Sequence, residues 1–321
     1  MGRKTKDRRD IFYRKAKLEG FRARSAFKLM QLDEEFKLLS NVERVVDLCA
    51  APGSWSQVIA NKVYHSRNEE ERKNVKIIAV DIQPMAPLEG VKQIQGDITK
   101  QSTADQIIDF FEGKKADLVV SDGAPDVTGL HDMDEYIQSQ LVLSALNIAT
   151  NILKEGGNFV AKIFRGKDVS LLYSQLRIFF QHVSVSKPKS SRNASIESFV
   201  VCHSFKIPEN YTPTMTQPIL LQNYDQDHQL TGLNRFIAPF LACGNLSPFD
   251  SDANYSLNAN LGEKTPNQSI QSNQINSNIP QEKDEKSKEK PDELYKFKPP
   301  VQNPISPPYS KAIQKRTKKK K

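Results

Sequence analysis

Short apolar runs alternate with helix-forming segments between about residue 25 and residue 205, and this alternation restricts the chain to few folds. The apolar runs, which we expect to be strands, are 44–49, 75–80, 91–95, 117–121, 158–164, 182–186 and 198–204. Helical patterning begins at Ser25 and recurs at 54–63, 101–111, 134–153 and 169–179, whereas the charged stretch 67–74 predicts an exposed loop. Strands separated by helices form a mostly parallel sheet with helices on both faces. Because no helix joins the last two strands, one should run antiparallel, which predicts an α/β fold with a seven-stranded sheet.

Composition divides the chain into four parts. Residues 1–24 are a basic segment, and 25–205 have the pattern of a globular domain. From 258 to 321 the chain is rich in Asn, Gln, Ser, Pro and Lys, which predicts a disordered tail with a basic end. The extension 206–257 contains two apolar patches, 218–221 and 235–241. These patches either pack back on the domain or dock a partner, and the sequence favours neither.

The basic start of the chain indicates a polyanionic partner. The formal net charge is +8, and residues 1–28 contain eleven basic side chains against three acidic ones. Phe12, Tyr13 and Phe21 are interleaved with these cations, a mixture that suits phosphates and stacked bases. The predicted RNA-binding residues are Arg8, Arg9, Arg22, Arg24 and Lys28. A solvated tail or a localisation signal explains the charge equally well. The alternative RNA-binding residues are Lys187, Lys189, Arg192 and the C-terminal lysines.

Several protein classes are excluded by what the sequence lacks. Cys49, Cys202 and Cys243 have no paired spacing and the five histidines are scattered, so we expect neither disulfides nor a metal site. No apolar run has transmembrane length, and no signal peptide or myristoylation pattern is present, so we expect no membrane association. The expected location is cytoplasmic, with the nucleus as a second compartment.

Four aspartates stand at or just after the ends of successive expected strands. Asp47 opens a small-residue turn that runs through Gly53, and Asp81, Asp97 and Asp122 follow in order. Ligands of such sheets bind at the carboxyl ends of the strands, and small residues allow the backbone to approach them closely. Each aspartate alone is explained by a turn or a cap. Together they favour a site for a nucleoside cofactor, in which Asp81 holds the ribose diol and Asp97 accepts from the adenine amino group.

The same turn resembles the cofactor loop of the FtsJ-type RNA ribose 2′-O-methyltransferases. The resemblance covers about residues 2–205 and is carried by five motifs: Asp47-Leu-Cys-Ala-Ala-Pro-Gly-Ser-Trp-Ser56, Arg22-Ala-Arg-Ser-Ala-Phe-Lys-Leu29, Ser121-Asp-Gly-Ala-Pro125, Phe159-Val-Ala-Lys-Ile-Phe164 and Ser190-Ser-Arg-Asn-Ala-Ser-Ile-Glu-Ser198. It implies a Rossmann-like methyltransferase fold and S-adenosyl-L-methionine as cofactor. By resemblance the cofactor contacts fall on Gly53, Trp55, Asp81, Asp97 and Asp122.

The stretch 123–132, the basic start and the tail after 205 resemble the eukaryotic tRNA anticodon-loop branch of that family. This branch implies methylation of nucleotides 32 and 34 of tRNA. It also implies two protein partners that select the nucleotide, a WD-repeat protein and a helical-repeat protein.

The family's catalytic Lys-Asp-Lys-Glu tetrad falls, by resemblance, on Lys28, Asp122, Lys162 and Glu197. A ribose hydroxyl must lose its proton as it attacks the methyl group, so we expect Lys162 to be the general base and Lys28 to position the substrate. A lysine is a base only when neutral, and its ordinary pKa is about 10.4. Burial, the second lysine and the cofactor sulfur lower that pKa, whereas the two carboxylates raise it.

Two other functions remain open from the sequence. A ribose methyltransferase of rRNA or of an mRNA cap would share the tetrad, and only the branch-specific stretches favour tRNA. A non-catalytic RNA-binding scaffold is the alternative from another class, and the complete tetrad argues against it.

Overall fold

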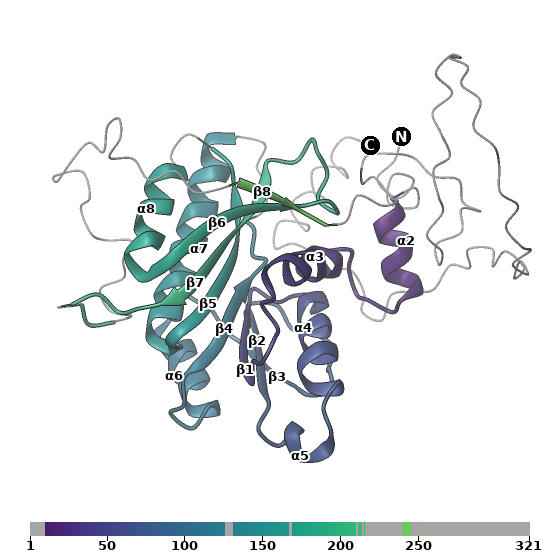
Figure 1. Cartoon of the computed structure of the whole chain (residues 1–321), viewed down its shortest axis with the longest axis vertical. Coiled ribbons are helices and arrows are strands. Elements are labelled where there is room, and N and C mark those ends of the chain that lie inside the picture. The colour runs from purple at the N-terminus through teal and green to yellow at the C-terminus, as the bar shows by residue number, and fades with distance from the viewer. Residues whose placement is uncertain are drawn as a thin grey trace, which may run out of the picture.

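The protein is built on one central sheet. The computed structural model describes residues 10–125, 131–166, 169–209, 211–213, 215, 240–244 and 251. Its eight strands lie in the order β3-β2-β1-β4-β5-β7-β6-β8 (Figure 1). They are β1 (Arg44–Leu48), β2 (Lys76–Asp81), β3 (Val91–Gln95), β4 (Ala116–Ser121), β5 (Leu153–Phe164), β6 (Phe180–Pro188), β7 (Glu197–Phe205) and β8 (Phe240–Cys243).

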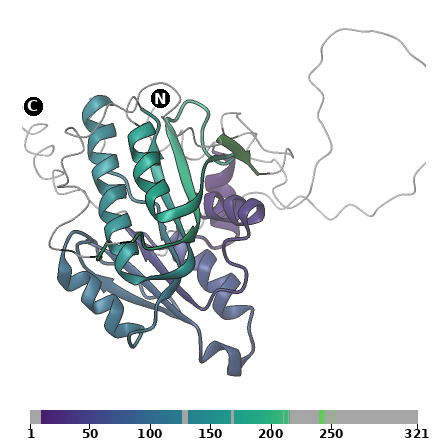
Figure 2. The ribbon, with the colours of Figure 1, turned by 60° about the vertical axis from the view of Figure 1, so that its left-hand side comes forward.

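Helices cover both faces of this sheet, as the alternation predicts. They are α2 (Ile11–Leu18), α3 (Ala26–Phe36), α4 (Ser54–Ile59) with its π-helical continuation η1 (Ala60–His65), α5 (Glu69–Arg72), α6 (Gln101–Phe110), α7 (His131–Ile152) and α8 (Val169–Phe179). Helices α6, α7 and α8 lie on one face, and α3 and α4 on the other (Figures 1 and 2). Within the described ranges no helix combines the length and apolarity needed to cross a bilayer.

Two cores follow from the alternation of side chains along the strands. Val46 and Leu48 of β1 are fully buried among residues of α6, α7 and α8. Val45, between them in the pleat, belongs to the second core with Leu29 and Trp55 from α3 and α4. A strand that is buried on both faces has no polar side, which explains why these strands appear as continuous apolar runs.

The expected direction of the strands is confirmed. Strands β1 to β5 run parallel, β7 runs antiparallel to both of its neighbours, β5 and β6, and seven strands form the sheet of the predicted domain. The extension contributes an eighth strand, because Phe240–Cys243 pairs with β6 in parallel. Packing back on the domain is therefore correct for residues 240–243. The patch 218–221 and the tail 258–321 lie outside the described residues.

Two predicted elements differ from the structure. Helix α7 ends at Ile152, and β5 begins at once with Leu153, so Gly156 and Gly157 lie inside a strand instead of ending a helix. The register shift against β4 in this region accommodates Gly156, whose φ is 75°. The stretch predicted as an exposed loop contains the helical turn α5. Asn68 and Glu71 form a reciprocal capping box at its start, which stabilises even so short a helix.

The segment before residue 25 is not a simple tail. Asp10 caps α2 by accepting the backbone N–H of Tyr13 at 3.1 Å. Phe12 of α2 is buried against Phe27, with ring centroids 5.6 Å apart, and the Phe21 ring also packs on Phe27. The prediction that the rings of Phe12, Tyr13 and Phe21 suit stacked bases is therefore wrong for Phe12, since an apolar cluster covers its ring. Arg8 and Arg9 lie outside the described residues.

Candidate active site

The small-residue turn after β1 is held open at the carboxyl edge of the sheet. The Asp81 carboxylate, at the end of β2, accepts the backbone N–H of Ala51 through Oδ2 and that of Gln83 through Oδ1, both at 2.8 Å. Gly53 has a φ of 99°, and a Cβ there would lie 2.7 Å from Nη1 of Arg22. The turn therefore requires glycine at this position for its backbone and for its close neighbour.

That neighbour, Arg22, joins two loops at this edge. Its guanidinium donates to the carbonyl of Pro52 at 3.0 Å and to that of Pro87 at 2.8 Å. Burial lowers the pKa of this guanidinium. Arg22 was predicted to bind RNA, which stays a prediction; in the structure it links the turn after β1 to the loop after β2.

Asp47 is the aspartate most strongly perturbed by its surroundings. It is fully buried, Ser56 donates a hydrogen bond to its Oδ2 at 2.5 Å, and Oδ1 has no partner among the described residues. Burial raises the pKa of the Asp47 carboxyl to about 7, with the charges of Asp122 and Asp81 acting in the same direction. A positively charged ligand beside Asp47 would oppose that rise in pKa.

Asp47 should therefore make folding stability depend on pH. Between the unfolded pKa of about 3.9 and the folded value of about 7, the folded state keeps a proton that the unfolded state has lost, so stability falls as pH rises. This difference amounts to at most about 4 kcal/mol at pH 8. We expect Asp47→Asn to be more stable than the parent at pH 8 and similar to it at pH 4, as measured by urea unfolding. The exposed Asp105→Asn is the control, and an equal effect of Asp47→Asn at both pH values would contradict the prediction.

Two further predicted cofactor residues, Asp97 and Trp55, have different surroundings. Asp97 follows β3, and its Oδ1 accepts the backbone N–H of Thr99 at 2.9 Å and the Thr99 hydroxyl at 2.8 Å. Trp55 is 2% exposed, its indole N–H donates to the Ser25 carbonyl at 2.9 Å, and its ring lies 5.6 Å from that of Phe199. The Trp55 ring is thus a core side chain, and only its backbone borders the turn.

The four tetrad residues form two ion pairs that couple to each other. Lys28 of α3 meets Glu197 at the start of β7, with Nζ 2.7 Å from Oε1. Lys162 of β5 donates to Asp122 twice, to Oδ1 at 2.9 Å and to the carbonyl at 2.8 Å. Gln138 of α7 fixes the second pair, because its amide donates to the carbonyls of Gly123 at 3.0 Å and Lys162 at 2.7 Å. Gln138 stands one helical turn before the buried Val142, and a polar side chain at such a position is the signal in the sequence that would have identified this contact.

The coupling of the pairs determines the protonation state of the lysine. Burial acts to lower the pKa of Lys162, but the carboxylates of Asp122 and Glu197 outweigh it, and the pKa is raised above its ordinary value. Burial acts to raise the pKa of Glu197, and Lys28 and Lys162 instead hold it at about 2. The sequence left open whether burial or the carboxylates dominate the pKa of Lys162. The carboxylates dominate, so Lys162 is a cation in the protein without ligand.

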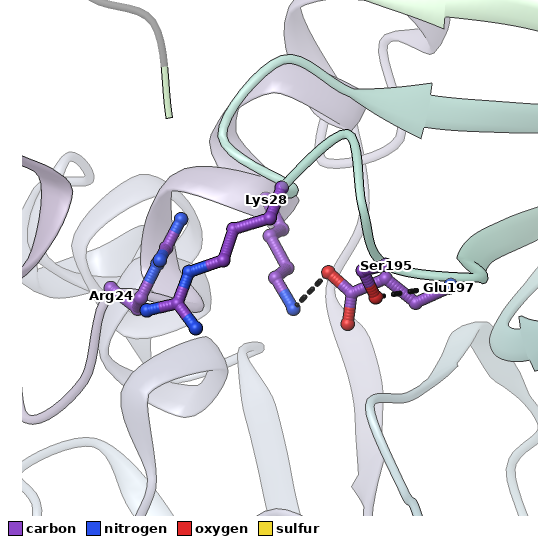
Figure 3. A pocket seen from close by; sticks show the side chains of 5 residues that line it. Arg24, Lys28, Ser195 and Glu197 are labelled. Carbon is purple, nitrogen blue, oxygen red and sulfur yellow. Dashed lines mark hydrogen bonds and ion pairs between the residues drawn. The ribbon is translucent and has the colours of Figure 1, made fainter. Parts of the chain in front are cut away.

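A cavity of about 200 Å³ opens beside the Lys28–Glu197 pair, and it is lined by Arg24, Lys28, Arg192, Ser195 and Glu197 (Figure 3). The Lys28 amine and the Glu197 carboxylate point toward each other at its wall. The Ser195 hydroxyl accepts the backbone N–H of Glu197 at 3.2 Å, which orients the start of β7. Three cationic side chains, one carboxylate and one hydroxyl thus line a cavity beside the tetrad, and this lining suits a polar, anionic substrate.

Comparison with known proteins identifies the family. The model of the family described as "FtsJ-like methyltransferase" matches residues 21–205. A mouse (Mus musculus) protein named tRNA (cytidine(32)/guanosine(34)-2'-O)-methyltransferase is 56% identical over 315 residues, 98% of this chain and 86% of the relative. The protein of the same name from Schizosaccharomyces pombe is 54% identical over 267 residues, 83% of this chain and 91% of the relative.

A solved structure agrees with the fold. The crystal structure of a protein described as a ribosomal RNA methyltransferase, from Plasmodium falciparum, is 29% identical to this chain and superposes with a TM-score of 0.51, covering 58% of this chain and 98% of the other. Together with the match over residues 21–205 and the tetrad at the carboxyl edge of the sheet, these similarities lead to one conclusion: the chain belongs to the FtsJ-like methyltransferase family, and it is a methyltransferase.

Proposed function

We propose that this protein transfers the methyl group of S-adenosyl-L-methionine to the ribose 2′-oxygen of nucleotides 32 and 34 in the anticodon loop of tRNA. The observation that carries the proposal is the coupled tetrad beside a cationic cavity, in a chain whose relatives at 54–56% identity are named for this reaction. Methylation of rRNA or of an mRNA cap would use the same tetrad, but the names of these relatives support tRNA.

The residues present fit the cofactor. When bound, S-adenosyl-L-methionine would supply an electrophilic methyl group on a positively charged sulfur. The buried Oδ1 of Asp47 has no partner among the described residues, and the pKa of its carboxyl is raised, so a positive charge at this edge of the sheet would be stabilised. We assign the ribose diol to Asp81 and the adenine amino group to Asp97, because each carboxylate stands at the end of its strand and is oriented by backbone N–H groups.

The tetrad would act on the ribose hydroxyl of the RNA. Lys162 would accept the proton of the ribose 2′-hydroxyl, and it must be neutral to do so. The positively charged sulfur of a bound cofactor would lower the pKa of Lys162 and so favour the neutral amine. Lys28, paired with Glu197 at the cavity wall, positions the hydroxyl, while Asp122 holds the amine of Lys162 in place through its hydrogen bonds.

The experiment that tests the function maps ribose methylation in total tRNA from cells with and without the protein. We expect 2′-O-methyl groups at positions 32 and 34 to disappear without it and to return on complementation. Unchanged tRNA together with a lost methyl group in rRNA or in an mRNA cap would overturn the proposed substrate. If methylation is unchanged in cells without the protein, and the protein binds RNA without modifying it, a non-catalytic RNA-binding scaffold would be favoured.

We further propose the organisation and partners that the family resemblance implies. Residues 25–205 are the catalytic domain, 1–24 contribute to RNA binding, and 206–257 serve as an extension of the domain that also docks a partner. The partners would be a WD-repeat protein for one nucleotide and a helical-repeat protein for the other, in the cytoplasm. Purification of the full chain from its own cells, followed by identification of the proteins bound to it, tests this arrangement.

The acid at the end of β2 should contribute strongly to cofactor affinity. Asp81→Ala removes a charge-assisted hydrogen bond to the ribose, which costs roughly 1.5–3 kcal/mol in binding. It also removes the acceptor for the Ala51 N–H, so the turn itself loosens. Asp81→Asn keeps an acceptor for that N–H and should lose less. Isothermal titration calorimetry measures both variants, with the exposed Asp109→Ala as control; unchanged affinity in Asp81→Ala would show that the acid is only structural.

A further inference from the structure

Two arginines from distant parts of the chain meet on one buried carboxylate beside the cavity. Arg24, just before α3, donates Nη1 to Oδ2 of Asp10, and Arg192 donates Nη2 to the same oxygen at 3.0 Å. The Asp10 side chain is 4% exposed, whereas those of Arg24 and Arg192 are 19% and 39% exposed. Both arginines line the cavity whose wall carries the Lys28–Glu197 pair (Figure 3).

The two arginines share one carboxylate among the described residues. Lys28 with Glu197, and Lys162 with Asp122, are neutral as pairs. Arg24 and Arg192 both pair with Asp10, and Arg24 also donates to the Ser190 carbonyl. Within the part of the chain that the structure describes, Arg192 hydrogen-bonds through Nη2 alone, and its side chain is 39% exposed. The remaining donors of its planar fork match the oxygens of one phosphodiester.

The backbone around Arg192 is held in place before any ligand binds. The Ser190 carbonyl accepts a hydrogen bond from Arg24, and the Ser190 N–H donates to Oε1 of Gln31 at 2.9 Å. The extension secures the same loop from its other side, since the Lys189 N–H donates to the carbonyl of Cys243 in β8 at 2.7 Å. Ser251 completes the bracing with a hydrogen bond from its hydroxyl to the carbonyl of Ser191 at 2.9 Å. A preorganised cation loses little entropy when an anion binds.

We propose that Arg24 and Arg192, held together by Asp10, bind a single RNA phosphate next to the ribose that enters the cavity. The proposal rests on the proposed function, which requires an RNA ribose at the tetrad. Asp10 prevents the two guanidinium groups from repelling each other, and the phosphate takes the outer donors of the fork in a bidentate, charge-assisted contact. Such a contact fixes the register of the strand, so that the chosen 2′-hydroxyl faces Lys28 and Lys162.

A purely structural role for the three residues is the competing explanation, because Asp10 also caps α2 and Arg24 also binds the Ser190 carbonyl. The two explanations differ in what they predict for RNA chemistry. A structural cluster has no reason to interact with one particular phosphate. A phosphate site does interact with one particular phosphate. Once either the Arg192 guanidinium or the charge of that phosphate has been removed, removing the other should have little further effect on affinity.

The test is a double-mutant cycle between protein and RNA. Anticodon stem-loops each carrying one neutral methylphosphonate, scanned across the loop, are titrated with the full-length parent and with Arg192→Ala. For the parent, we expect one position adjacent to a target ribose to lose about tenfold or more in affinity. Arg192→Ala should lose a similar amount with unmodified RNA and less than about threefold further with that methylphosphonate. Its slope of log affinity against log salt should fall by roughly 0.7–0.9, as for one phosphate contact.

Matched variants separate the outcomes. Lys73→Ala removes an equal charge from the exposed pair that Lys73 forms with Glu70 at the end of α5, and it should retain the parent's methylphosphonate profile. Helix α5 lies at the other end of the molecule from α2 (Figure 1). Arg192→Lys keeps the positive charge but lacks the planar pair of donors. It should restore the salt slope of the parent but only part of the affinity that Arg192→Ala loses. Cofactor affinity, measured in each variant, shows that the fold is intact. Additive losses at every position would overturn the phosphate site. If the parent protein fails to methylate tRNA in cells, the proposed function fails instead, whatever the binding cycle shows.

Discussion

Lys162→Ala should reduce methyl transfer by roughly 10²–10⁴-fold while cofactor affinity stays within about twofold of the parent, because a positioned general base contributes about that factor. The Lys162 amine contacts Asp122 and is coupled to Glu197, so its removal affects the side of the site that faces the ribose hydroxyl. Single-turnover methylation of tRNA, with calorimetry for the cofactor, measures both quantities.

Lys154→Ala is the matched control for this substitution. Lys154 lies on the same strand, β5, but at its opposite end, where its half-exposed side chain pairs with the buried carboxylate of Asp117. We expect its activity to equal that of the parent. A Lys162→Ala protein that binds cofactor normally and still turns over at more than about a tenth of the parental rate would contradict the assignment of Lys162 as the base.

The second large effect concerns pH. The pKa of Lys162 is raised by the carboxylates, and only the neutral amine accepts a proton, so the methylation rate should increase with pH across the neutral range. The sign is that of a group that must lose a proton: below its pKa, the active fraction rises about tenfold for each pH unit. The slope of log rate against pH in single-turnover experiments should therefore approach one.

Glu197→Gln should move this rising limb to lower pH. The substitution removes one of the two carboxylates that raise the pKa of Lys162, and it leaves the charge of Lys28 uncompensated, which acts in the same direction. The pH at which the limb levels off reports the pKa, and the rate on the plateau is read separately, so loss of substrate positioning does not obscure the shift. Glu112→Gln, which breaks an ion pair with Lys76 elsewhere on the surface, should leave the limb in place. A pH-independent rate in the parent would falsify the role of base, and Lys162 would then position the hydroxyl as an ammonium ion.

The elements that sequence patterns predicted well are those set by neighbouring residues. Strand β1 carries Val45, Val46 and Leu48 because both of its faces are buried, and it is followed by a turn that requires Gly53. The tetrad residues are recognisable because each lies in a short motif, and the structure brings Lys28 to Glu197 and Lys162 to Asp122. The assignment of roles to these residues stays a prediction until the variants are measured.

The features that the sequence concealed depend on contacts between distant segments. The basic residues before residue 25 have the composition of a solvated tail. Helix α2 nevertheless packs on the domain, because Phe12 packs against Phe27 and Asp10 accepts hydrogen bonds from Arg24 and Arg192. No local pattern marks residues 240–243 as a strand, since β8 exists only because β6 offers an unpaired edge.

By itself, the sequence determined the order of strands and helices, the family and the identity of the residues at the site, because periodicity and short motifs are local properties of the chain. Only the tertiary structure decided the state of those residues. The pKa of Lys162 depends on the balance between burial and two carboxylates from other strands, and the pairing of Arg24 with Arg192 depends on a carboxylate supplied by Asp10. Electrostatic energies follow distance and burial, and the fold sets both.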